Sequence, residues 1–203
     1  MIDLSQDKFA PVPLGPILIS SIEEVIGKDF TKAAFDPLLL SGMHVDEKDH
    51  SLNTLSLLQL RLENAFGQSG GRGLTLRLGR IFFNRAIRVY GRSLGFSTQE
   101  FFLKTMREKI SSVLQAVAAL FFQFTGREIL IEESPTHIYC SLQACPFCLN
   151  RKENAPICHF LIGLLQEALL WASGGKIYHV DETKCLACGD EECRFVIDRT
   201  PLI

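Results

Sequence analysis

The chain has 203 residues, of which 47% are hydrophobic and 22% charged, and its net charge is −2 at pH 7. This composition excludes a disordered chain, and the charge gives no reason to expect nucleic acid or an acidic membrane surface as a partner. The first ten residues lack a basic stretch followed by an apolar core, so no secretory signal is expected. The longest apolar run, residues 113–122, is too short for a membrane span, which needs about 20 residues. We therefore expect a cytoplasmic protein of one domain.

Helices are expected in the first part of the chain. Apolar residues at helical spacing predict a helix that begins near Pro16 and ends at Gly27. A second short helix is predicted over residues 31–40, and the polar residues 41–51 are expected to form a loop. The next predicted helix runs from Asn53 or Thr54 to Gly67.

The glycine cluster at residues 69–73 predicts a tight turn, or a place where two backbones meet closely. A helix is predicted after it, over residues 74–91. Ser97 and Glu100 have the spacing of a capping box, which predicts that the longest helix covers residues 98–124 and ends at Gly126.

The pattern changes after residue 126. Alternating residues predict strands over 128–133 and 137–142, joined by a turn at Ser134-Pro135. A helix is predicted from Pro156 to Gly174-Gly175, and further strands over 176–182 and 193–198 flank a turn at 185–192. The layout predicts one α+β domain, with a helical part followed by a small antiparallel sheet and one helix.

All seven cysteines lie between Cys140 and Cys193. In a cytoplasmic protein, such clustering indicates metal or redox chemistry more often than structural disulfides. The two C-x-x-C pairs, Cys145/Cys148 and Cys185/Cys188, are about 40 residues apart, and two such pairs can supply four thiolates to one ion. Thiolates favour zinc or an iron–sulfur cluster. A dithiol redox motif is disfavoured because neither pair clearly opens a helix after a strand.

One group of donors is better placed than the others. Glu182, Cys185 and Cys193 lie at the ends of two adjacent predicted strands, and the turn between them can bring these ends together. Cys140, alone in a strand, is more typical of a small buried apolar residue. We therefore expect the C-terminal group to bind a metal.

Six arginines fall within a stretch that contains no acid: Arg72, Arg77, Arg80, Arg85, Arg88 and Arg92. They predict either an anion site or a solvated face paired with acids elsewhere. Nucleic-acid binding is not expected, because the whole chain is slightly acidic and aromatic residues suited to base stacking are not clearly interleaved.

Two motifs resemble those of a known family, the 4-vinyl-reductase type domain. The first motif runs Leu62-Glu63-Asn64-Ala65-Phe66-Gly67, Gly70-Gly71-Arg72-Gly73-Leu74 and Arg77-x-Gly79-Arg80-x-Phe82-Phe83. The second runs Gly174-Gly175, Val180-x-Glu182-x-x-Cys185-x-x-x-Gly189-Asp190 and Cys193-x-Phe195-x-Ile197. The resemblance implies one domain over residues 1–203, with a helical part at about 14–126 and a cysteine-rich part at about 127–198.

The implied fold is that of the effector-binding domain of phenol- and xylene-sensing activators, of TRAPP-type subunits and of haem-type nitric-oxide sensors. In this fold a helical bundle packs on a small antiparallel sheet. The resemblance also implies a structural zinc held by Cys158, Glu182, Cys185 and Cys193. The other cysteines, Cys140, Cys145, Cys148 and Cys188, could form a second zinc or iron–sulfur site, or Cys145 and Cys148 could join Cys158.

The family binds small, mostly apolar molecules in an internal pocket, which implies a non-enzymatic sensor or carrier of a hydrocarbon, aromatic or tetrapyrrole-like ligand. The candidate lining residues are Phe82, Phe83, Phe121, Phe122, Phe160, Ile162, Trp171 and Tyr178. Apolar residues at helical spacing are more often core than pocket lining, and His137 and Tyr139 could add polar contacts. No nucleotide-binding glycine motif follows a predicted strand. The resemblance further implies a homodimer, and a separate output partner is expected.

Two other functions remain open from the sequence. One is an iron–sulfur redox or electron-transfer protein that uses the additional cysteines. The other is an accessory subunit in tetrapyrrole metabolism.

Overall fold

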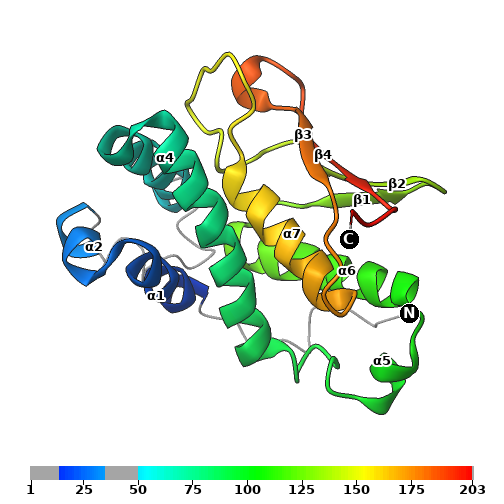
Figure 1. The fold of residues 1–203 in the computed structure, drawn as a ribbon. Helices are drawn as coiled ribbons and strands as arrows, with labels where there is room; N and C mark the ends of the chain where they lie inside the picture. Colours follow the sequence, from blue (N-terminus) through cyan, green and yellow to red (C-terminus); the bar gives the residue numbers. More distant parts are fainter. Residues whose placement is uncertain (1–13, 35–49, 203) are drawn as a thin grey trace.

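A four-stranded antiparallel sheet packs against a group of helices, as predicted (Figure 1). The computed structural model describes residues 14–34 and 50–202. The helices are α1 (Leu14–Ile26), α2 (Lys28–Ala34), α4 (His50–Tyr90), α5 (Gln99–Leu103), α6 (Met106–Thr125) and α7 (His159–Ala172). The strands are β1 (Leu130–Glu133), β2 (His137–Leu142), β3 (Val180–Lys184) and β4 (Cys193–Asp198), and a 3-10 turn, η2 (Leu186–Cys188), connects the last two. No helix in the described ranges has the length and hydropathy that a membrane crossing requires.

The sheet has the strand order β1-β2-β4-β3. β4 lies between β2 and β3, and Leu142 is paired with Cys193 and Cys140 with Phe195. Alternate residues of β4 are buried, because α7 contacts β3 and α6 contacts β1 on the covered face of the sheet. The predicted hairpin of β1 and β2 is confirmed, and the predicted last strand matches β4.

The break in α4 lies at Gly67 and not in the glycine cluster. Gly67 has φ 75° and ψ 162°, a backbone conformation that favours glycine, and residues 69–73 are helical. The prediction of a tight turn at residues 69–73 is therefore wrong, but the alternative prediction, that two backbone segments meet closely there, is confirmed. A Cβ atom on Gly71 would lie 2.4 Å from Glu63 Cα, so the second segment of α4 passes directly against the first.

The helix predicted over residues 98–124 is two helices. Thr98 caps α5 by accepting a hydrogen bond from Phe101 N, and Lys104 is extended. The capping box belongs to Thr105 and Glu108, which begin α6. The predicted end at Gly126 is confirmed, since this residue has φ 66° and its N–H donates to Phe122 O.

Other helix starts also differ from the prediction, and α4 begins at His50 instead of Asn53 or Thr54. α2 begins at Lys28, and the remainder of the predicted helix and loop, residues 35–49, lies outside the described residues. α7 begins at His159 and not at Pro156, with Cys158 as its N-cap. The N–H group of Cys158 donates to the Glu182 carboxylate at 2.7 Å, which fixes the start of α7 against β3.

The helices α4 and α7 cross each other with their backbones in contact (Figure 1). A Cβ atom on Gly163 of α7 would lie 2.0 Å from Leu76 O, and one on Gly79 of α4 would lie 2.0 Å from Phe160 O. Only glycine leaves room for each backbone to touch the other here. This crossing sets the position of α7 relative to the rest of the helices.

We predict that Gly163→Ala destabilises the protein by about 3 kcal/mol, because the methyl group forces the α4–α7 crossing apart. Gly73→Ala is the matched control, since Gly73 is an exposed residue of α4 with nothing within 4 Å of an added Cβ. It should stabilise the protein by about 0.5–1 kcal/mol through helix propensity. Urea denaturation followed by circular dichroism measures both changes. Equal stability of the two variants would contradict the close crossing.

Candidate metal centre and apolar cavity

Four cysteine thiols and one carboxylate meet at the junction of α7, β3 and β4. The donor atoms of Cys148, Cys158, Glu182, Cys185 and Cys193 all lie within 4.8 Å of one another, and all five residues are buried. Cys148 Sγ is 3.0 Å from Cys158 Sγ, 3.3 Å from Cys185 Sγ and 3.4 Å from Cys193 Sγ. The cluster therefore contains the four donors predicted for a zinc site, together with Cys148.

Local structure at the η2 turn places two of these donors. Asp190 Oδ2 accepts a hydrogen bond from Cys185 N at 2.7 Å, and Leu186 N donates to Cys193 Sγ at 3.4 Å. Gly189 closes the turn with φ 94°, a conformation that favours glycine. These contacts hold Cys185 and Cys193 side by side at the end of the β3–β4 hairpin.

The loop between β2 and α7 brings a further pair of thiols. Cys148 N donates to Cys145 O, so the C-x-x-C segment is a turn, and Cys145 Sγ lies 3.4 Å from Cys158 Sγ. The loop is fixed to α4, because Ser56 Oγ donates to Leu149 O and the buried Arg151 pairs with Glu63 at 2.6 Å. The segment that follows Cys148 is thus anchored on α4.

The chemistry of the buried donors suits a cation. The pKa of Glu182 is raised to about 8, mainly by burial and then by the charge of Cys185. The Oε1 atom of Glu182 is buried without a hydrogen-bond partner. Hydrogen bonds from neighbouring thiols, first that of Cys145, lower the pKa of Cys148. A buried group of such donors is costly unless a positive charge lies among them.

The geometry of the donors suits a single thiophilic ion. A tetrahedral ion with bonds of about 2.3 Å to sulfur separates its sulfur ligands by about 3.8 Å. The recorded sulfur–sulfur distances, from 3.0 Å for Cys148–Cys158 to 3.7 Å for Cys158–Cys193, are somewhat shorter but close to this edge. The residues present therefore fit a mononuclear metal site.

The four additional cysteines do not form a site of their own. Cys145 and Cys148 lie at the cluster around Cys158, which was one of the predicted alternatives. Cys140 is buried in β2, where burial raises its pKa to about 12, and Cys188 is exposed. Among the described residues no second group of three or more metal-ligating side chains is present.

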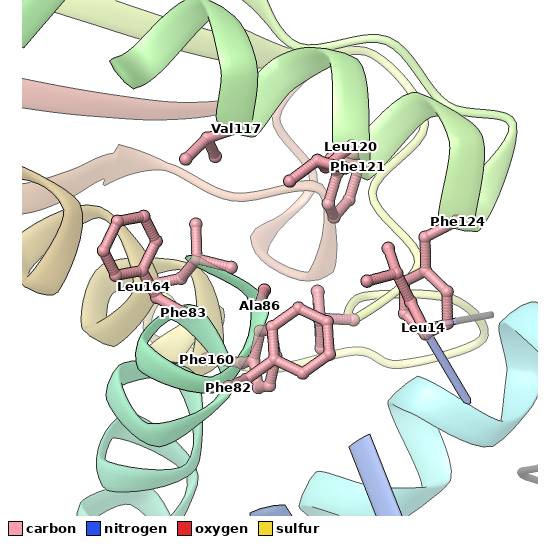
Figure 2. A pocket seen from close by; sticks show the side chains of 11 residues that line it. Leu14, Phe82, Phe83, Ala86, Val117, Leu120, Phe121, Phe124, Phe160 and Leu164 are labelled. Carbon is pink, nitrogen blue, oxygen red and sulfur yellow. The ribbon is translucent and has the colours of Figure 1, made fainter. Parts of the chain in front are cut away.

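A narrow apolar cavity lies between α1, α4, α6 and α7, and the volume open to the centre of a water molecule is about 30 Å³ (Figure 2). Figure 2 shows side chains from these helices pointing toward one another. The lining side chains are Leu14, Phe82, Phe83, Ala86, Val117, Leu120, Phe121, Phe124, Phe147, Phe160 and Leu164. None of them is polar.

Four of the predicted lining residues, Phe82, Phe83, Phe121 and Phe160, line this cavity. The other four do not. Phe122 is exposed and Ile162 is half-buried on α7, while Trp171 packs on Phe96 and Phe101. Tyr178 lines a separate hollow beside Met106.

The polar side chains proposed to orient a ligand, His137 and Tyr139, also lie elsewhere, and Arg194 covers the Tyr139 ring. Sequence reasoning missed Phe147, because it lies in the cysteine loop and has no periodic pattern around it. Among the arginines of α4, Arg85 pairs with Glu24 at 2.6 Å and Arg80 donates to Gln166, which is typical of a solvated face.

The C-terminal part of the chain matches a known protein family. Residues 138–199 match the 4-vinyl-reductase domain. No curated protein sequence matches the chain with significance. The phenol-responsive sensory domain of the transcription activator PoxR, solved with phenol, is similar at a TM-score of 0.54 and 16% identity, covering 72% of this chain and 73% of that chain.

H-NOX proteins are similar over most of the chain. The Fe(II) unliganded H-NOX protein from K. algicida has a TM-score of 0.54 and 14% identity, covering 94% of this chain and 97% of that one. The H-NOX protein from S. oneidensis in the Fe(II)NO state has a TM-score of 0.54 and 13% identity, covering 91% and 98%. The resemblance seen in the sequence is therefore confirmed: residues 138–199 match the 4-vinyl-reductase domain, and the chain has the fold of the PoxR sensory domain and the H-NOX proteins.

Proposed function

We propose that the chain is a sensory domain that binds a small apolar molecule in the cavity between α1, α4, α6 and α7. The observation that carries this proposal is the lining of the cavity, which is apolar throughout the described residues and is contributed by several elements of the fold. A cleft between packed helices is a common place for a small-molecule site. The similar PoxR domain is described as phenol-responsive, which supports a sensory function for this fold.

The cavity favours a small ligand without hydrogen-bonding groups. Its volume of about 30 Å³ open to a water centre holds one or two water molecules, so ring movement must accompany ligand entry. Burying a hydroxyl group among apolar side chains without a partner costs about 1–3 kcal/mol. Toluene is therefore a better match to this lining than phenol.

A haem or another tetrapyrrole is a poorer match. The lining side chains offer no histidine, cysteine or tyrosine to an iron atom within the described residues. A macrocycle would also need a far larger space. The cavity thus supports a hydrocarbon or small aromatic ligand over a tetrapyrrole-like one, and gives no support to an accessory function in tetrapyrrole metabolism.

We further propose that the thiol cluster holds one structural zinc ion. Cys158, Cys185 and Cys193 would supply three thiolates. The fourth donor would be either Glu182, as the sequence resemblance implies, or Cys148, which lies beside it in the cluster. Such a closed set of four ligands, when it holds zinc, cross-links the start of α7 to the β3–β4 hairpin. An iron–sulfur cluster fits less well, because sulfurs this close together leave no space for several irons and sulfides between them.

The homodimer, the separate output partner and the cytoplasmic location that were expected from the sequence stay predictions. The same is true of a non-enzymatic function.

The proposed zinc site predicts the metal content of the protein. Purified protein should contain about one zinc per chain and no visible chromophore. Cys193→Ala should lose the zinc and several kcal/mol of stability, because metal binding contributes directly to folding. Elemental analysis and thermal unfolding measure these effects.

The matched control for the metal prediction is Cys140→Ala, since Cys140 is equally buried on the neighbouring strand β2 but lies outside the cluster. It should keep the zinc. Loss of zinc from both variants, or an absorption band near 400 nm that bleaches on reduction, would contradict the proposed zinc site.

The second prediction concerns the ligand. Calorimetry should show that toluene binds at least about tenfold more tightly than phenol, because the phenol hydroxyl finds no partner. Ala86→Ser places a hydroxyl group in the lining and should narrow this ratio. Ala116→Ser is the matched control, a buried position of α6 outside the cavity, and should leave the ratio unchanged. Tighter binding of phenol than of toluene by the wild type would refute the proposed ligand class.

A further inference from the structure

One short segment belongs to both the thiol cluster and the apolar cavity. Phe147 stands between Cys145 and Cys148, and its side chain is almost fully buried. Its ring stacks on Phe160 with 4.8 Å between centroids and an angle of 20° between planes, and it lines the cavity. The thiols on either side of it contact Cys158 Sγ at 3.4 and 3.0 Å. The backbone of one short segment therefore positions both the Phe147 ring in the cavity and the Cys148 thiol in the cluster.

The cluster offers more donors than a tetrahedral ion accepts. Four cysteines and Glu182 lie within 4.8 Å of one another, whereas zinc takes four ligands in a structural site. Cys158, Cys185 and Cys193 are fixed by α7 and by the β3–β4 hairpin. Cys148 and Glu182 are the two remaining donors, and one of the Glu182 oxygens, Oε1, is buried without a hydrogen-bond partner.

We propose that Cys148 and Glu182 are alternative fourth ligands of the metal, and that the bond to Cys148 holds Phe147 in the wall of the cavity. The proposal rests on the proposed function, since it needs both the metal and the apolar ligand. In the closed arrangement, which the structure shows, Cys148 Sγ lies among the other three thiols and Phe147 packs on Phe160.

In the open arrangement Glu182 replaces Cys148. Glu182 would bind the ion in place of Cys148, and the proton that the Glu182 carboxyl group gives up would pass to the released Cys148 thiol. One anionic ligand would thus replace another, and the site would keep four ligands. Phe147 is then free to leave the cavity with residues 145–148, while Leu149 and Arg151 keep their contacts with α4. In the closed arrangement the volume open to the centre of a water molecule is about 30 Å³, which is too small for a ligand. Departure of the Phe147 ring would supply the missing space. Ligand binding and the choice of fourth ligand are therefore coupled, and the coupling is reciprocal.

The first test counts the thiolates on the metal. Zinc is replaced by Co²⁺, whose near-ultraviolet charge-transfer band grows with each thiolate ligand. The wild type should show four thiolates, Glu182→Gln should show the same band, and Cys148→Ser should lose about a quarter of it because three thiolates remain. Cys188→Ser is the control, since Cys188 is exposed and outside the cluster. An unchanged band in Cys148→Ser would overturn the proposal.

The second test connects the metal to the cavity, with benzene as the probe. Cys148→Ser should bind benzene at least about tenfold more tightly than the wild type, because a closed state populated to about 90% is removed. In the cobalt-loaded wild type, saturating benzene should lower the charge-transfer band by about a quarter as Cys148 leaves the metal. This second measurement decides the matter even where Cys148→Ser does not fold.

The outcomes separate this proposal from the proposed function. Benzene binding with equal affinity in the wild type and Cys148→Ser, and with no change in the cobalt band, overturns the link between the two sites and leaves the sensory function intact. Benzene binding to neither protein overturns both. The proposal is supported if benzene binds more tightly to Cys148→Ser than to Cys188→Ser and also lowers the cobalt charge-transfer band of the wild type by about a quarter.

Discussion

The backbone contact between α4 and α7 is the constraint on which the rest of the structure depends. Gly79 and Gly163 face the backbone of the opposite helix, and no side chain fits between them. Phe82 and Phe83 follow Gly79 within one turn, and Phe160 and Leu164 flank Gly163, so the same crossing brings much of the cavity lining together. It also sets where α7 begins, and hence where the Cys158 thiol meets the β3–β4 hairpin. Moving α4 and α7 apart at this crossing would disturb both the cavity and the thiol cluster.

Sequence reasoning succeeded where the signal is local. Gly27 and Gly126 end helices because each adopts a positive φ, and alternating residues defined β2 and β4. It failed where two local signals compete. The 98–124 helix was predicted as one because Ser97 and Glu100 resemble a capping box, yet Thr98 and Thr105 are the side chains that cap helices. The register of a cap is decided by which hydroxyl reaches a free N–H group, and spacing alone does not give this.

The candidate site was likewise predicted only in part from the sequence. The resemblance named Cys158, Glu182, Cys185 and Cys193, and the structure brings these donors together. The sequence left open whether Cys148 joins Cys158 or belongs to a second site, since this depends on how the loop after β2 folds back onto α7. Likewise, Trp171 and Tyr178 look like candidate lining residues but lie outside the cavity. Helical spacing identifies a buried face without telling which neighbour covers it.

The position of Phe147 gives the additional cysteines a physical purpose. A loop that only covered a cavity would be held by apolar packing, which yields gradually as a ligand pushes in. Under the proposed exchange of ligands, the loop would instead have two discrete arrangements, because the bond to Cys148 would be either made or replaced. Discrete states are what a sensor needs to turn a small gain in apolar contact into a defined change elsewhere. Such a change would reach α4, since Arg151 and Leu149 of the loop contact Glu63 and Ser56 of that helix.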